Sequence, residues 1–522
     1  VSLLDSQNIP RELLERYKNT LVVDNFIYNL KKYSLITNQM DKNSPVSSFS
    51  IHRSTQKIAL AYLIKAIAPE EKNRLIESIA KTLENYAFDR IDEENLPKIK
   101  LLVSHCEHFL YHNKLLIPII KGIVAGELGG LYFYLGDYKK AKKFLEHSLT
   151  LLNEQDKNNS ISIAKNLEWL GNVNRELGDY DKAVNLLEHS LKLYRKDIDN
   201  NQKNIGRVLA YLGNAYRNQG KIQKAKNLLE ESLIIYRKHY PNNYAGIARV
   251  LSYLGHIHWI LGEYSMAKKL HEESQQLYCN YCPENEIGIA RSLVYLGKTY
   301  SKLGELKAAR HANEKSLVLY KKYYKDHHID VAWSYLALGS VYQELGDIRK
   351  SKNILEKTLA IYKTHYEGEH IDIAWVSAYL GSTYSELGYH QKAINLLEKS
   401  RKVYERTFGT NHTDMAWILT LLGKAYLREG SFSTAAAYLN KALQILQQAN
   451  HTDAYNCLES LGDLQVEKLR QREKRKGDLK LLKAQNQAKE YFLQALNIIK
   501  RKFPKDSPHI TRIENKIKSI SK

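Results

Sequence analysis

The chain has 522 residues, of which 43% are hydrophobic, and a net charge of +21. This length exceeds one ordinary compact core, so we expect several domains or a repeat array, and the hydrophobic fraction excludes wholesale disorder. The positive charge favours an acidic partner, namely nucleic acid, anionic lipid or an acidic protein, although Lys beside Glu in helical registers also makes an ordinary soluble surface.

Residues 1–70 differ from the rest of the chain. The apolar pattern predicts a helix at 3–14 and a second helix at 30–36. A strand pair is expected around the short run at 49–53, followed by a helical run to Leu63. This order resembles the winged helix that follows the nucleotide-binding module in NB-ARC/STAND signalling ATPases. In that family a histidine of a Met-His-Asp-like motif contacts the nucleotide phosphate, and the resemblance gives this role to His52, although Arg53 departs from the Asp. The alternative is a structural histidine at a helix start.

The nucleotide-binding module itself is not in the sequence. No G-x-x-x-x-G-K-[ST] motif occurs; Gly297-Lys298-Thr299 has Ser292 where the first glycine is required and lies inside a predicted helix. The chain begins at Val1 rather than Met, so it can be a fragment of a longer protein. Residues 71–121 are predicted to be a helical linker.

A 42-residue repeat occupies residues 122–450. Two glycines recur in each copy, seven residues apart, and a small residue follows five residues later. The first glycine follows a leucine at each copy: Leu128-Gly129, Leu170-Gly171, Leu212-Gly213, Leu254-Gly255, Leu296-Gly297, Leu338-Gly339, Leu380-Gly381 and Leu422-Gly423. If the first glycine is position 8, it allows a second helix to approach closely, and the glycine at position 15 ends the first helix. One helix pair cannot bury its apolar face alone, but stacked copies can.

These spacings resemble the tetratricopeptide repeat, whose usual period is about 34 residues. The longer period and segments such as 380–388 look like the kinesin-light-chain type. The resemblance implies an all-α, right-handed α-solenoid of eight helix pairs, preceded by the small winged-helix-like domain. Residues 451–522 are expected to form a degenerate ninth repeat, with the charged segment 470–476 inserted, and a capping helix near 508–520.

The first helix of each pair is expected to line a concave surface. Its exposed face should carry positions 2, 5, 6, 9, 12 and 13, because these lie opposite the core positions. The candidate partner-binding residues at these positions are Lys165, Arg207, Arg249, Arg291, Trp333, Trp375 and Trp417 (position 2), Trp169, Tyr211, Tyr253 and Tyr295 (position 6), Asn172 and Asn214 (position 9), and Arg175 and Arg217 (position 12). His256, Lys298 and Lys424 share position 9, and Trp259 shares position 12.

Arginine and tryptophan are frequent at binding hot spots, and basic groups suit carboxylates or phosphates on a peptide. The alternative for the tryptophans is packing against the preceding repeat; for the arginines we see no use in a core. Basic and aromatic residues together also occur on single-stranded nucleic-acid surfaces, but no RNA- or DNA-binding module accompanies them.

Other patterns indicate no chemistry. Cys279-x-x-Cys282 lacks the second pair that zinc requires, and His328-x-Asp330, His370-x-Asp372 and His412-x-Asp414 are explained by helix capping. We therefore expect no catalytic residues, no metal and no cofactor. Four cysteines suit a reducing compartment such as the cytoplasm, and the most apolar stretch is interrupted by Lys121 and Glu127, so no membrane span is expected.

The sequence thus predicts a non-enzymatic scaffold that binds a protein or peptide, for which the positive charge favours acidic character, as the ligand-sensing arm of an NB-ARC/STAND-type signalling protein. A free-standing adaptor and a nucleic-acid binder are the alternatives.

Overall fold

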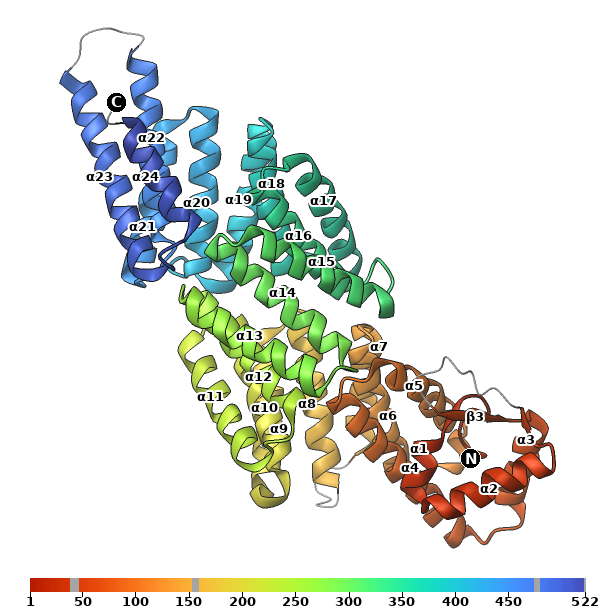
Figure 1. Ribbon diagram of the computed structural model, residues 1–522. Helices are drawn as coiled ribbons and strands as arrows, with labels where there is room; N and C mark the ends of the chain where they lie inside the picture. Colours follow the sequence, from red (N-terminus) through yellow and green to blue (C-terminus); the bar gives the residue numbers. More distant parts are fainter. Residues whose placement is uncertain (38–46, 153–158, 474–478, 521–522) are drawn as a thin grey trace. The chain divides into compact units, whose positions relative to one another are not determined.

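The computed structural model describes residues 1–37, 47–152, 159–473 and 479–520 (Figure 1). The chain divides into two compact units. The first comprises Val1–Ala215 and Ile234–Gly246, and the second comprises Tyr216–Leu233 and Ile247–Lys522.

The first unit begins with a small three-stranded sheet and three helices. These elements are β1 (Ile9–Pro10), α1 (Arg11–Tyr17), α2 (Thr20–Lys32), β2 (Ile36–Thr37), β3 (Ser48–Ile51) and α3 (Arg53–Lys65). The central strand β3 pairs antiparallel with both neighbours, so that Phe49 lies opposite Ile9 and Ile51 opposite Ile36. The order of helix, helix, strand pair and helix is present, but the first two helices lie at 11–17 and 20–32 rather than at 3–14 and 30–36, and β1 precedes them as a third strand. His52 is exposed at the N-cap of α3 and makes no side-chain capping bond.

Two helices and a 3-10 turn follow: α4 (Pro69–Asp92), α5 (Leu96–Tyr111) and η1 (Asn113–Leu115). Both helices pack against the first repeat helix, α6 (Pro118–Tyr134). Residues 71–111 are therefore helical except for the turn at 93–95.

Helix pairs make up the repeat region, as the 42-residue period predicts. After α6 come α7 (Tyr138–Leu151), α8 (Ser160–Glu176), α9 (Tyr180–Tyr194), η3 (Arg195–Asp197), α10 (Ile198–Asn218), α11 (Ile222–His239), α12 (Tyr244–Ile260), α13 (Tyr264–Tyr281), α14 (Glu286–Leu303), α15 (Leu306–Tyr323), α16 (Ile329–Glu344), α17 (Ile348–His365), α18 (Ile371–Glu386), α19 (His390–Phe408), α20 (Thr413–Glu429) and α21 (Phe432–Gln448). Even-numbered helices from α6 to α20 are the first helices of the pairs. The chain is thus an all-α repeat solenoid, except for its small N-terminal sheet.

The two recurrent glycines have the predicted roles. A Cβ atom on Gly171 would lie 2.7 Å from Cγ of Leu187, so only glycine lets α9 pack this closely on α8. Gly178 has φ of 86°, the left-handed conformation that ends a helix. A serine also joins the two helices of several pairs, because its hydroxyl donates to the carbonyl 26 residues earlier, as Ser190 does to Ala164 at 2.7 Å.

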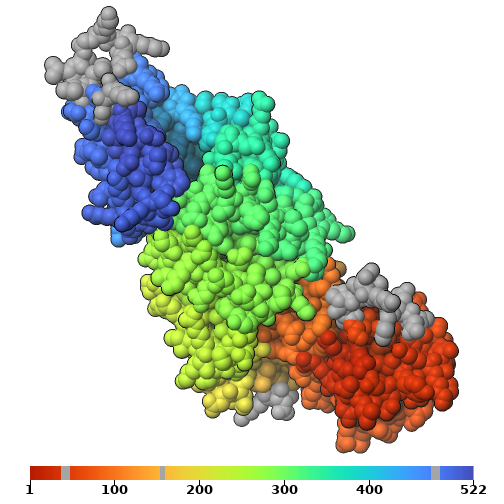
Figure 2. Space-filling view, viewed as in Figure 1, coloured from red at the N-terminus to blue at the C-terminus, as the bar shows by residue number. Residues whose placement is uncertain are grey.

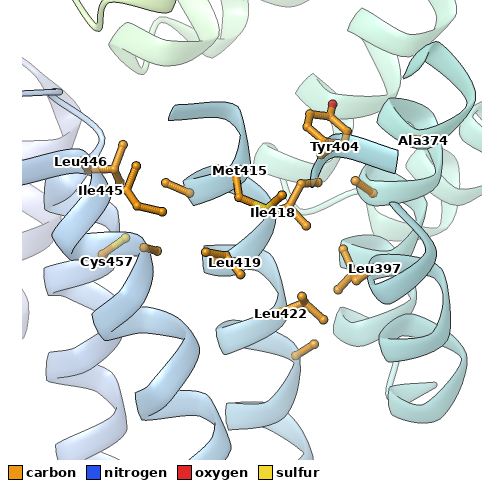
Figure 3. Close-up of a cluster of buried hydrophobic side chains, with 14 of the residues drawn as sticks. Ala374, Leu397, Tyr404, Met415, Ile418, Leu419, Leu422, Ile445, Leu446 and Cys457 are labelled. Carbon is orange, nitrogen blue, oxygen red and sulfur yellow. The ribbon is translucent and has the colours of Figure 1, made fainter. Parts of the chain in front are cut away.

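Buried aliphatic side chains fill the space between neighbouring pairs. In one such cluster of the second unit, Leu419 and Leu422 of α20 lie between Leu397 of α19 and Ile445 of α21 (Figure 3). Each helix therefore contributes to the core of its own pair and of the next pair, which is the nearest-neighbour packing of a repeat protein.

The second unit ends with three helices, α22 (Ala454–Glu473), α23 (Leu479–Lys502) and α24 (Pro508–Ile520). Helix α24 is the terminal helix predicted near 508–520. Gly462 of α22 contacts Phe492 of α23, where the regular repeats use a smaller side chain. Residues 474–476 of the predicted charged insertion lie outside the described residues. Among the helices that are described, none is both long and apolar enough to cross a membrane.

Candidate partner-binding site

A buried cluster of charged residues occupies the first helices of the first unit. Lys165 of α8 is 7% exposed, and its Nζ lies 2.9 Å from Oε1 of Glu84 on α4 and 3.9 Å from Oε1 of Glu127 on α6. Burial raises the pKa of Glu127 to about 8. Burial also opposes the charge on Lys165, but Glu127 and Glu84 outweigh it and raise the pKa of the amine. Lys165 is therefore a cation held by its own chain.

Arg207 of α10 belongs to the same cluster and is 1% exposed. Its Nε and Nη2 donate to the two carboxylate oxygens of Glu168 at 2.5 and 2.9 Å. The guanidinium also lies 4.5 Å from the centre of the Phe88 ring and 3.9 Å from Asp92, both on α4. The carboxylates and the ring together replace the water that a free arginine would keep.

The prediction that arginine at position 2 has no use in a core is therefore wrong for Arg207. The predicted exposure of positions 2, 6 and 9 is also wrong over several repeats, because these residues are buried: Lys165, Arg207 and Arg249, Trp169, Tyr211, Tyr253 and Tyr295, and Asn172 and Asn214. In the first unit two contacts bury these side chains. Acidic residues of helix α4 pair with Lys165 and Arg207 at position 2. The aromatic rings of Phe133 and Tyr134 pack around Trp169 at position 6. Arg175 is likewise buried and pairs with Glu176, whereas Arg217 is half-buried and bonds to Asn218.

The second unit has a small pocket between its first helices. It is lined by Trp259 (α12), Lys298, Ser301 and Lys302 (α14), Trp333, Leu336, Ala337, Ser340 and Glu344 (α16), and Trp375 and Tyr379 (α18). Its open volume of about 20 Å³ is room for roughly one water molecule. The pocket can therefore admit one small chemical group, such as the end of a side chain.

Lys298 is the chemically distinctive residue of this pocket. Its Nζ is buried and has no hydrogen-bond partner among the described residues, and it lies 4.1 Å from the centre of the Trp375 ring and 4.8 Å from that of Trp259. Burial, aided by the positive charge of Arg217, lowers the pKa of Lys298 to about 7. Two indole faces partly compensate the ammonium, and the carboxylates of Asp414 and Asp372 only partly offset the effect of burial.

The three tryptophans of position 2 divide between the two expected roles. Trp333 and Trp375 line the pocket, and Trp333 also lies 4.9 Å from the ring of Tyr295 in the preceding repeat. Trp417 packs instead against the buried cluster of Figure 3, with its ring 5.0 Å from Tyr379 and 6.2 Å from Tyr404. All three are half-buried, and Arg291 is half-buried as well.

A comparison with known families decides what kind of repeat this is. The tetratricopeptide repeat family matches residues 122–196, 200–280, 288–364 and 368–448, which is more than half of the chain. The chain belongs to the tetratricopeptide repeat family. Tetratricopeptide repeats form a protein-interaction scaffold that presents extended binding surfaces, and the fold is typically non-catalytic.

Several solved structures are similar at low identity. BtubC (BKLC) from P. vanneervenii is 18% identical over 44% of this chain and 91% of its own, with a TM-score of 0.35. A Rap protein complexed with competence and sporulation factor is 12% identical over 70% of this chain and 98% of its own, with a TM-score of 0.46. The apo form of the quorum sensor NprR from B. thuringiensis is 18% identical over 67% and 92%, with a TM-score of 0.45. No curated protein sequence matches the chain.

The recurrent His-x-Asp motif of these tetratricopeptide repeats is a helix cap, but the capping residue is the histidine. In each motif Nδ1 of the histidine accepts the N–H of the aspartate, at 3.2 Å for His412 and Asp414. The same arrangement at His451 and Asp453 begins α22. Because Nδ1 is the acceptor, Nε2 of each ring carries the proton and points away from the helix.

Sequence reasoning missed several residues of both sites. Glu84 and Asp92 of α4 lie outside the repeat, so no periodicity marks them. Trp259 and Lys298 were on the predicted face but were not selected, because neither belongs to an unbroken series at its position. A lysine at position 9 with a tryptophan at position 12 of the preceding repeat is the signal that could have identified the pocket.

Proposed function

We propose that this tetratricopeptide scaffold binds a protein or peptide partner at the pocket around Lys298 in the second unit. The observation that carries the proposal is the buried ammonium of Lys298, which has no hydrogen-bond acceptor among the described residues although aromatic rings flank it. A buried cation without an acceptor is costly, and an acceptor brought by a partner removes that cost.

The group that best fits this pocket is a carboxylate on the partner. One carboxylate oxygen matches the space available, and a carboxylate both accepts from Lys298 and neutralises it. Glu344 lines the same pocket, but its carboxyl bonds to Ser301. Trp333 and Trp375 then provide apolar surface for the rest of the partner segment.

The finer proposal is that the chain is the ligand-sensing arm of an NB-ARC/STAND-type protein acting in the cytoplasm. The order of strands and helices in residues 9–65 supports it, together with an exposed His52 directly after β3. The intact mass of the protein from its native cell tests this role. A mass well above 60.4 kDa with a nucleotide-binding module ahead of Val1 supports the arm, and a mass near 60.4 kDa supports a free-standing adaptor.

The binding proposal is tested with a random peptide library of defined length displayed against the immobilised protein. The wild-type chain should enrich peptides with Asp or Glu, and Lys298→Met should lose that enrichment. Lys424→Met is the matched control, because Lys424 occupies position 9 of the eighth repeat outside the pocket, and burial lowers its pKa too. Equal enrichment by Lys298→Met and wild type would refute the proposed site.

A further inference from the structure

A second pocket lies within the first unit, outside the repeats. Helix α1 packs against both α2 and α4 (Figure 1). Residues of these three helices, together with Val1 and Leu4, line a pocket of about 240 Å³, which we call the N-terminal pocket. In Figure 2 its lining residues are coloured red to orange. The N-terminal pocket is much larger than the pocket around Lys298, so it can hold a whole small molecule and not only one group.

The lining of the N-terminal pocket is apolar. Leu13 of α1, Val23 of α2 and Leu83 of α4 line it, and each is buried. Val22 and Phe26 of α2 line it as well, but they are 47% and 39% exposed. Among the described residues, no lining side chain has a buried polar atom without a hydrogen-bond partner. The pocket therefore suits an apolar molecule, which would remove Val22 and Phe26 from solvent.

One positive side chain lies at this pocket. Lys18 is the single charged side chain among the lining residues; it is exposed and makes no ion pair with the described residues. The carboxylates of Glu15 and Asp24 are already paired, because Arg11 contacts them at 2.7 and 2.6 Å. Burial lowers the pKa of the Val1 amino group to about 6, so this amine carries little charge at neutral pH. Lys18 is therefore the group that can pair with an anion at the pocket.

The volume of the pocket sets the size of its ligand. An apolar cavity of about 150 Å³ holds benzene, so about 240 Å³ corresponds to roughly ten carbon atoms. Most of the lining side chains are aliphatic, and they fit a flexible alkyl chain without requiring a flat ring. An alkyl tail of this length with one carboxylate at its end matches the pocket in size, in polarity and in charge.

We propose that the N-terminal pocket binds a medium-chain alkyl carboxylate of about ten carbons, with its tail between α2 and α4 and its carboxylate at Lys18. The tail covers the exposed parts of Val22 and Phe26, and the carboxylate pairs with an ammonium that has no carboxylate partner among the described residues. This inference goes beyond the proposed function, because it concerns a different pocket, in the other unit, and a small molecule in place of a protein or peptide.

The tail is tested by isothermal titration calorimetry of the full chain with saturated carboxylates from hexanoate to dodecanoate, each below its micelle concentration. The association constant should rise about fourfold for each added methylene and level off near decanoate. Val22→Trp, which fills the pocket from a partly exposed position, should weaken decanoate binding by about tenfold or more. Leu21→Trp is the matched control, because Leu21 precedes Val22 on α2, is 71% exposed and does not line the pocket. It should leave the affinity unchanged, and circular dichroism checks that both variants are folded.

The carboxylate is tested with Lys18→Met. This variant should weaken decanoate binding by about two- to fivefold, as expected for an exposed ion pair, and should leave the binding of 1-decanol unchanged. The place of binding is tested with a decanoate analogue that carries a photoreactive diazirine at the end of its tail. After irradiation, peptide mass spectrometry should find the label within residues 13–26 or 79–83.

Three results would overturn the proposal: an affinity that does not depend on chain length, an equal loss with both tryptophan variants, or a label elsewhere in the chain. Sedimentation equilibrium examines the other occupant, a second copy of the chain. A dimer that Val22→Trp dissociates and Leu21→Trp does not, without decanoate binding, would also overturn it. No measurement here involves Lys298 or a peptide, so failure of this site is distinguishable from failure of the proposed function.

Discussion

The ammonium of Lys298 lies 4.1 Å from the centre of the Trp375 ring, two repeats further along the chain, and no hydrogen-bond acceptor reaches it within the described residues. Lys165 and Arg207 show the opposite arrangement, since each is buried beside a carboxylate of its own chain. The described residues thus include buried basic groups that pair with carboxylates of their own chain, and Lys298, whose ammonium lies between two aromatic rings. This difference separates structural charges from a candidate binding residue.

Replacing Lys298 with Met should stabilise the second unit near neutral pH by about 2 kcal/mol, because a poorly compensated buried charge is removed. The pKa of Lys298 is about 7 in the folded protein against a usual value of 10.5. The unfolded chain therefore holds one more proton between these values, and the wild-type free energy of unfolding rises with pH across that window. The advantage of the Met variant should accordingly shrink at pH 10. Urea denaturation at pH 7 and pH 10 measures the difference in the free energy of unfolding between the Met variant and wild type. An equal difference at both pH values would contradict the assigned pKa.

Truncating Arg207 to Ala should destabilise the first unit by about 3–5 kcal/mol, because Glu168 is left buried and uncompensated. Replacing both residues, with Arg207→Met and Glu168→Gln, should recover most of that loss. A double-mutant cycle by chemical denaturation measures the coupling. A small loss from Arg207→Ala, with partner binding abolished instead, would restore Arg207 as a partner contact.

Gly171→Ala should destabilise the protein by about 1–3 kcal/mol, because the new Cβ overlaps Leu187. Gly346→Ala is the matched comparison, since Gly346 has φ of 83° and open space around it. Gly346→Ala should lower the free energy of unfolding by only about 1 kcal/mol, because the new side chain meets no neighbour and the loss comes from the left-handed backbone alone. Thermal denaturation of both variants distinguishes overlap from backbone strain, and equal losses would show that the close helix approach does not limit position 8.

Acid should weaken the second unit partly through His509. Burial first, and then the charge of Arg512, lowers the pKa of His509 to about 4 from a usual 6.5. The folded protein needs the neutral ring, so this stability is fully present above pH 6.5 and is lost as the pH falls towards 4, by up to about 3 kcal/mol. His509→Gln keeps a donor for the Lys302 carbonyl without titrating. As the pH is lowered from 7 to 4, the denaturation midpoint should fall less steeply for this variant than for wild type. Identical slopes would mean that protonation of His509 does not contribute to the loss of stability in acid.

The repeat architecture could be predicted from the sequence because its determinants are local and periodic. Gly171 and Gly178 act through neighbours within one helix pair, and the same spacing recurs in every copy. The roles of Lys165 and Arg207 could not be predicted, because Glu84 and Asp92 come from a helix outside the repeat, about two to three repeat lengths earlier. The Asp453–Lys302 pair spans 151 residues, and a single sequence carries no pairing signal over that distance.

Binding at the pocket depends on the protonation of Lys298. The pKa of Lys298 can be measured by NMR on lysine-labelled protein, first alone and then with an acidic peptide selected from the library. We expect a value near 7 in the free protein and a rise towards 10.5 when a carboxylate occupies the pocket. A pKa near 10.5 in the free protein, unchanged by the peptide, would contradict the claim that Lys298 is the unsatisfied group awaiting a partner.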